Sequence, residues 1–236
     1  MKTVLIALIL LAPSPSAIAE DAAQPTQRLD LSTVTEIRIT GEASSISLTT
    51  TESEPYQATL GGTRSGWFAK WYSSWFYTDC RTSSRMHIEN STLYVEASPA
   101  GWLEPSDCKV EFKANVRKET SVAIAQAASQ VDLAGDYSAV SLDNKAADFT
   151  LNGYAKSIDL RADAIRSHLG FDRARKGDAI RIAGRSLDAS LAFASDTQVS
   201  YRVDAVAAMV DSSLPNTPGA DTSVEIKGQY VRATIR

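Results

Sequence analysis

Seven aromatic side chains fall within the eleven positions from residue 67 to 77. Indole and phenol rings are apolar with a polar edge, so they can stack on sugars or lie at a lipid–water interface. The candidate binding residues are Trp67, Trp71, Tyr72 and Trp75. The alternative interpretation is structural, with the rings covering one end of the domain or packing over its sheet. Membrane contact is expected only at this segment, if anywhere.

A second set of candidates lies in a charged stretch around residues 159–178. Arg173 and Arg175 could form a basic rim, because a guanidinium offers a planar fork of donors to carboxylates on an anionic glycan. Some β-helix enzymes cleave acidic polysaccharides with clustered carboxylates and basic groups. The plainer alternative is a set of solvated turns and strand exteriors.

The sequence contains no recognisable catalytic motif. His87 and His168 are the two histidines, and each falls on the outward face of an expected strand. A zinc site requires three or four ligands, and the nucleophile elbow Gly-x-Ser-x-Gly does not occur. We therefore predict no catalytic residue, no metal ligand and no cofactor, although a Ser–His–Asp arrangement formed only by folding stays open.

The two cysteines are Cys80 and Cys108. In an exported chain an even number of cysteines favours a disulfide, which would contribute about 3 kcal/mol if unstrained. A redox role would need a closely spaced Cys-x-x-Cys pair. The expected function of this pair is structural.

The first nineteen residues are typical of a secretory signal. A basic start is followed by the apolar run 4–12, and Ala17 and Ala19 place small residues before the expected cleavage site. A transmembrane helix would need about 20 apolar residues. Beyond residue 19 the chain has 23 basic and 28 acidic residues, a net charge of −5. We expect an exported protein, periplasmic or at the cell surface, with no attraction to nucleic acid.

These candidates must be positioned by short strands that repeat every nine residues. An apolar–polar–apolar triplet starts at each of five equally spaced positions, namely Val122, Val131, Val140, Phe149 and Ile158. Alternation with a period of two indicates a strand with one buried face. A fixed period indicates one supersecondary unit copied many times. The same triplets occur earlier, at Ile37 and Ile46.

The repeat predicts an all-β fold, a β-solenoid or β-helix with coils of about 18 or 27 residues. In the shorter coil Val122 lies beside Val140, and Asp143 lies next to Arg161 on the outside, as a pair of opposite charges. A β-sandwich or an antiparallel meander is the alternative, and it would place Val122 beside Val131.

The expected organisation is a signal peptide over 1–19, a lead-in over 20–33 and a single β-solenoid domain over 34–236. An aromatic and cysteine-containing insert at about 61–110 interrupts it. Within this insert, Met86–Ile88 and Leu93–Val95 should form a hairpin around the turn-like set 89–92. The period slips again at 171–177.

This combination resembles the bacterial exported "putative adhesin" families, including the head-GIN, autotransporter-adhesin-like domain. The residues that carry the resemblance are the early pair of strands with Gly41-Glu42, the cysteine insert and the repeated Val/Ile-x-Leu strands with glycine turns. The resemblance covers most of 34–205 and rests on architecture. It implies a β-solenoid outside the cytoplasm and an adhesin-like role.

Two classes of function follow. The first is a non-catalytic surface or envelope binding module that contacts glycan or protein, and the second is a carbohydrate-active enzyme of the β-helix type. A purely structural envelope protein is a third reading. The sequence does not fix the oligomeric state or the ligand.

Overall fold

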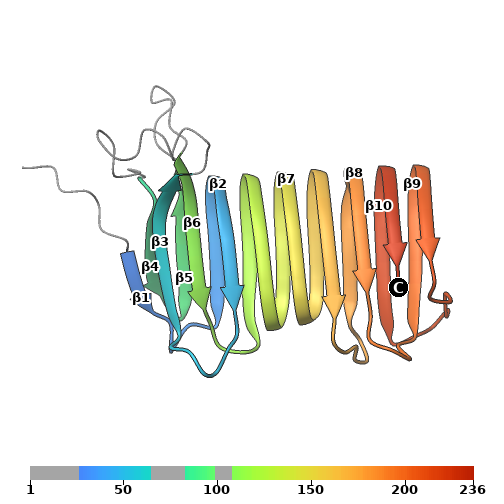
Figure 1. Ribbon diagram of the computed structural model, residues 1–236, viewed down its shortest axis with the longest axis horizontal. Coiled ribbons are helices and arrows are strands. Elements are labelled where there is room, and N and C mark those ends of the chain that lie inside the picture. The colour runs from blue at the N-terminus through green and yellow to red at the C-terminus, as the bar shows by residue number, and fades with distance from the viewer. Residues whose placement is uncertain (1–26, 65–82, 99–107) are drawn as a thin grey trace, which may run out of the picture.

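The structure, a computed structural model, describes residues 27–64, 83–98 and 108–236. These residues form strands and loops with no helix, so the all-β prediction is confirmed for them (Figure 1). The strands are β1 (Gln27–Asp30), β2 (Glu36–Thr49), β3 (Gln57–Arg64), β4 (Arg85–Glu89), β5 (Thr92–Ala97), β6 (Cys108–Asn115), β7 (Thr120–Phe171), β8 (Ala179–Ala192), β9 (Val199–Ser212) and β10 (Thr222–Ile235).

Several predicted residues lie outside this part of the chain. The aromatic candidates Trp67, Trp71, Tyr72 and Trp75 are among them, and so is Cys80. The structure records no disulfide among the residues it describes, so the pairing of Cys80 with Cys108 stays a prediction. The described ranges also hold no helix long and apolar enough to cross a bilayer.

The long strands pair with one another in parallel. Ile37 of β2 lies opposite Val122 of β7, and Ile46 lies opposite Val131. At the other end of β7, Ile158 lies opposite Ile180 of β8. Residues with the same place in the nine-residue pattern therefore become neighbours on parallel strands, which an antiparallel meander would not produce.

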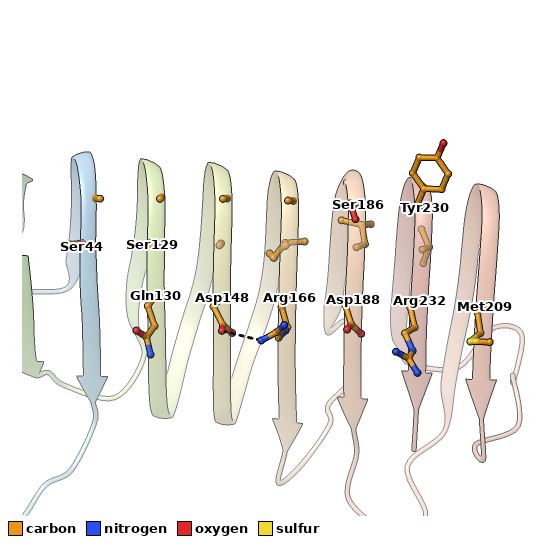
Figure 2. Close-up of a pocket in the computed structure, with 18 of the residues that line it drawn as sticks. Ser44, Ser129, Gln130, Asp148, Arg166, Ser186, Asp188, Met209, Tyr230 and Arg232 are labelled. Atoms are coloured by element: carbon orange, nitrogen blue, oxygen red, sulfur yellow. Dashed lines mark ion pairs between the residues drawn. The ribbon is translucent and has the colours of Figure 1, made fainter. Parts of the chain in front are cut away.

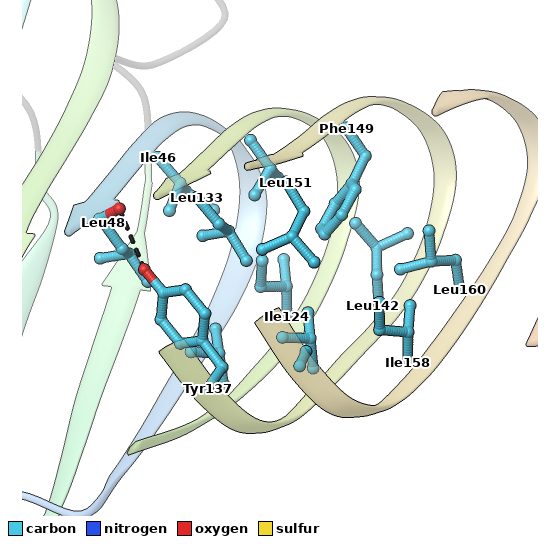
Figure 3. Close-up of a cluster of buried hydrophobic side chains, with 14 of the residues drawn as sticks. Ile46, Leu48, Ile124, Leu133, Tyr137, Leu142, Phe149, Leu151, Ile158 and Leu160 are labelled. Atoms are coloured by element: carbon cyan, nitrogen blue, oxygen red, sulfur yellow. Dashed lines mark hydrogen bonds between the residues drawn. The ribbon is translucent and has the colours of Figure 1, made fainter. Parts of the chain in front are cut away.

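β2, β8, β9 and β10 each contain a bend that reverses the burial pattern, and the longer β7 contains several, including those at Ala127 and Asp163. In β8 the buried residues are Ile180 and Ile182 before the bend, and Leu187, Ala189 and Leu191 after it. The alternation therefore changes phase near Arg185, a residue that is skipped in the pairing of β8 with β10. The bend divides the strand into a first arm and a second arm whose apolar faces look toward each other, and the core lies between the arms (Figure 3).

Buried amide side chains hold the bend where β2 meets β7. The backbone N–H of Gln126 donates to Oδ1 of Asn144 (2.9 Å), eighteen residues further along the chain. Nδ2 of Asn144 donates to Oγ of Ser129 (2.7 Å), and Ser44 donates to Oε1 of Gln126 (2.9 Å). The spacing of eighteen is the distance between equivalent positions in β7, so these amides tie one turn of the chain to the next.

Short strands cover the end of the stack at β2. β5 and β6 both pair with β2 in parallel, β3 pairs with β6 antiparallel, and β1 pairs with β3. The predicted hairpin is confirmed, because β4 and β5 are antiparallel with Met86 opposite Val95. Asn90 and Ser91 in its turn have positive φ values of 46° and 65°. Much of the expected insert therefore belongs to the sheet.

Asp143 and Arg161 line the same surface hollows, but the carboxylate that Arg161 contacts directly is that of Asp159. Arg161 donates from Nε and Nη2 to the carboxylate of Asp159 on its own strand, at 3.1 and 2.9 Å. Asp159 and Arg161 are two residues apart on one strand, so their side chains point to the same face. The guanidinium of Arg161 can therefore bind the carboxylate of Asp159 through two hydrogen bonds.

The chain doubles back at the end of the stack opposite β1. β10, the last strand in sequence, pairs with both β8 and β9, so it lies between them. Val224 of β10 lies opposite Ile180 of β8 on one side and Tyr201 of β9 on the other. β9 is therefore the outermost strand at this end (Figure 1).

One buried hydroxyl in the core gives a stability prediction. Ser167 is 0% exposed, and its Oγ has no hydrogen-bond partner among the described residues. A buried, unpaired hydroxyl is costly, so Ser167→Ala should raise the free energy of unfolding by about 1 kcal/mol. Urea denaturation followed by circular dichroism measures the change.

Ser44→Ala is the matched control for Ser167→Ala. The Ser44 hydroxyl is also buried but donates to Gln126, so its removal should lower the free energy of unfolding by about 1 kcal/mol. Two changes of the same sign would contradict the assignment of Ser167 as an unpaired buried hydroxyl.

Candidate functional site

A long groove runs across the strands on the second-arm side of the bend (Figure 2). Its volume is about 1250 Å³. At the bend of each strand, two consecutive residues point outward instead of alternating. This leaves a recess beside the bend, and the recess recurs on each strand from β2 through β9. Because the strands pair in register, these recesses lie side by side and form one groove across the strands.

The floor of the groove is made of small and apolar side chains. Alanines that follow the bend are exposed on successive turns of the chain, at Ala128, Ala146 and Ala164. These small side chains leave room above the sheet.

One wall of the groove carries charges that alternate in sign. Asp148 and Arg166 of β7 are followed by Asp188 of β8 and Arg232 of β10, in a row at the same level (Figure 2). Neighbouring strands are about 4.8 Å apart, and Arg166 lies 3.7 Å from Asp148. The four charges of this row cancel, and Lys109, which also lines the groove and donates to Gln130 (2.7 Å), adds one positive charge. The groove therefore presents donors and acceptors with only a weak net charge.

An aromatic ring stands on β10, one strand before the end of the groove at β9. Tyr230 is 62% exposed and projects from its strand (Figure 2). Tyr230 was not among the residues predicted from the sequence, because those aromatic candidates came from a cluster and Tyr230 is a single ring. The signal that could have found it is the alignment of Tyr230 with the alanines of the preceding turns.

The predicted residues Arg173 and Arg175, in the loop between β7 and β8, both contact the ring of Tyr154 in β7. Their Cζ atoms lie 4.5 and 4.9 Å from the centroid of the Tyr154 ring. Arg173 also contacts Asp136 (2.7 Å) and Asp172 (3.1 Å). The two carboxylates largely neutralise the positive charge of Arg173 within the fold. Its Nε is buried and has no hydrogen-bond partner among the described residues.

The hydroxyl of Tyr154 is fixed from the other side. It donates to Oδ1 of Asp178 (2.8 Å), while Oδ2 of Asp178 accepts from the backbone N–H of Arg175 (2.6 Å). Burial raises the pKa of Tyr154 and so does the bond to Asp178, whereas the two arginines lower it. These contacts order the loop in which the period slips, which is a structural role for both arginines.

Within the described ranges, the histidines and acidic side chains do not converge on a metal site. His87 lies on the outer face of β4 and stacks on Tyr94, with ring centroids 5.2 Å apart. His168 is exposed and pairs with Ser190 of β8. In the described ranges, three or more metal-binding side chains do not gather anywhere.

No family model and no curated protein matches the sequence. Solved structures that the chain resembles include a "putative cell adhesion protein" from Clostridium sporogenes, at 8% identity and a TM-score of 0.47 over 89% of this chain and 97% of that one. A "putative adhesin" from Bacteroides fragilis gives 11% identity and 0.31, over 89% and 95%. A "putative lipid binding protein" from Parabacteroides distasonis gives 14% identity and 0.28, over 89% and 96%.

Proposed function

We propose that the protein is a non-catalytic, exported binding module whose groove holds an extended neutral glycan. The observation that carries this proposal is the groove itself, with its floor of alanines, its balanced row of charges and the exposed ring of Tyr230. The apolar floor and the ring suit the faces of sugar rings. The charged side chains can hydrogen-bond to hydroxyl groups on either side of a sugar.

A glycan fits this groove better than a peptide strand. The groove crosses the strands, and their backbone groups are used in pairing between neighbours. A peptide therefore has no open sheet edge along the groove to which it could add as a strand. The alternating charges of the wall, with a net charge of only one positive unit when Lys109 is included, also favour an uncharged ligand over a polyanion or a polycation.

The wider architecture belongs to the same proposal. We infer that the bent parallel strands are the coils of a β-solenoid with an 18-residue repeat, supported by the contact from Gln126 to Asn144. The proposal also includes export by the segment 1–19 to the periplasm or cell surface, and a second contact surface at Trp67, Trp71, Tyr72 and Trp75. These parts rest on the sequence.

The proposed groove can be tested with two groove variants. Tyr230→Ala and Arg166→Ala should each weaken binding to a neutral polysaccharide by about tenfold, because each removes a contact near the middle or end of the groove. The experiment screens neutral and anionic envelope polysaccharides against the purified protein, followed by calorimetry with the best binder.

Arg181→Ala is the matched control for Arg166→Ala. The two arginine side chains are similarly exposed, at 59% and 62%, and each lies near one carboxylate, at 3.8 and 3.7 Å. Arg181 is on the first arm and outside the groove, so its removal should leave affinity unchanged. Equal losses in both variants, or unchanged binding in all, would refute the groove as the site.

An enzyme of the β-helix type is the second candidate, because carboxylates and arginines share the groove wall. Asp148 and Asp188 lie on either side of Arg166. Release of shorter oligosaccharides from a bound polysaccharide, abolished by Asp148→Asn together with Asp188→Asn, would favour this second function over binding alone.

A further inference from the structure

The outermost strand β9 leaves one edge of the sheet open. In the described part of the chain it pairs along its length with β10 on one side only. Residues that would be core on an inner strand are uncovered here: Val210 is 43% exposed, whereas its partner Ala233 on β10 is buried. Val203 and Ala208 are also more exposed than their β10 partners Ile226 and Val231.

The start of β9 is protected, which marks where the open edge begins. Asn216 in the following loop accepts from the backbone N–H of Tyr201 and donates to its C=O, both at 3.0 Å. The side-chain amide thus takes the place of a neighbouring strand at this one residue. The edge from Arg202 to Asp211 has no such cover in the described structure.

The bonds on β9 also show which backbone groups point to the open edge. Tyr201 bonds to Asn216 on that side, so by strand alternation Val203 and Ala205 point the same way. In the second arm, Ser213 donates to Ile235 of β10 (3.0 Å). Residues 211 and 213 therefore face β10, and Val210 faces the open edge.

We propose that two copies of the protein join end to end, with β9 of one copy antiparallel to β9 of the other about a twofold axis through the bend. The bend between Ala205 and Ala207 divides β9 into two arms of similar length. A twofold axis there exchanges the arms and reverses their direction, so each first arm meets the second arm of the other copy. Such a contact is isologous and closes as a dimer.

One register of this contact satisfies the backbone, the apolar face and the charges together. Val203 lies opposite the partner's Val210, with the free N–H and C=O groups of both residues facing each other. Ala205 lies opposite the partner's Ala208, so inward residues meet inward residues and the two cores become continuous. On the outer face, Arg202 lies opposite the partner's Asp211, and symmetry repeats this opposite-charge pair.

Other registers fail at least one of these conditions. A slip by one residue places inward side chains opposite outward ones. A slip by one full step in one direction sets Asp204 opposite the partner's Asp211, which are like charges. The same slip in the other direction sets Arg202 opposite the partner's Met209 and moves the bends out of alignment. The self-complementary pattern of β9 is what favours a second copy over an unrelated strand.

Charge reversal with rescue tests the dimer. The purified protein should sediment as a concentration-dependent dimer in analytical ultracentrifugation. Arg202→Asp creates two like-charge pairs across the axis, and so does Asp211→Arg, so each should weaken the dimer by about tenfold or more. The double variant Arg202→Asp/Asp211→Arg restores both opposite-charge pairs and should recover the dimer. Arg181→Asp, which changes the same charge on β8, is the control.

Hydrogen exchange of the unmodified protein is a second test of the dimer. The amides of Val203, Ala205 and Val210 should exchange more slowly as the protein concentration rises through the dissociation constant, whereas Tyr201, already bonded to Asn216, should not change. A protein that is monomeric at all concentrations would overturn the proposal. So would a dimer that both single reversals leave intact, or one that the double variant fails to restore.

Discussion

Gly153→Val is expected to lower the free energy of unfolding by about 4 kcal/mol, close to the whole stability of a small domain. Gly153 has a φ of +135°, which residues with a side chain rarely adopt. A Cβ at this position would also overlap the backbone carbonyl oxygen of Gly135, eighteen residues earlier. Since that carbonyl belongs to the neighbouring turn of the chain, it cannot move without separating the two turns. Urea denaturation measures the loss.

Gly177→Val separates the two causes of this loss. Gly177 also has a positive φ, +88°, but a Cβ there would meet nothing within 4 Å. The cost should therefore be backbone strain alone, about 1–2 kcal/mol. If both variants lost the same stability, the close approach of Gly153 to Gly135 would not be what the glycine serves.

Phe149→Ala should lower the free energy of unfolding by about 3–5 kcal/mol. The ring is fully buried and lies between the two arms of the coil, beside Leu151 (Figure 3). By the eighteen-residue spacing, its neighbours in the stack are Val131 and Ser167, and both are smaller. The ring therefore fills space that neither neighbour could fill, and its removal leaves a cavity. Chemical denaturation, with thermal melting as a second measure, checks the value.

Phe149→Leu is the control for this cavity. Leucine keeps most of the apolar volume, so the expected loss is about 1 kcal/mol. Equal losses for leucine and alanine would show that the aromatic shape, and not the filled volume, determines stability at this position.

The strands and their buried faces could be predicted because their information is local. Val122, Ile124 and the equivalent residues of later turns alternate with polar residues, and alternation alone indicates a strand with one buried face. The hairpin of Met86 and Leu93 follows from the turn residues between them. Since these patterns need no knowledge of distant segments, they survive in the structure.

The order of the strands at the β9 end could not be predicted. β8, β9 and β10 have the same apolar spacing, so any order would bury similar side chains, and nothing in the pattern indicates that the last strand enters between the other two. The contacts of Arg173 could not be predicted for a related reason. They join Arg173 to Tyr154 and Asp136 from a loop without a period, and residue type alone does not indicate such partners.

The place of β10 has a consequence for how the chain is completed. A polypeptide that is synthesised from its N-terminus can stack β2, β7 and β8 as they emerge. β9 emerges next, yet in the described part of the chain its long partner is β10, which emerges last. Docking of β9 must therefore wait for β10, and a chain that stops near Ser212 would carry β9 as an unattached, protease-sensitive tail.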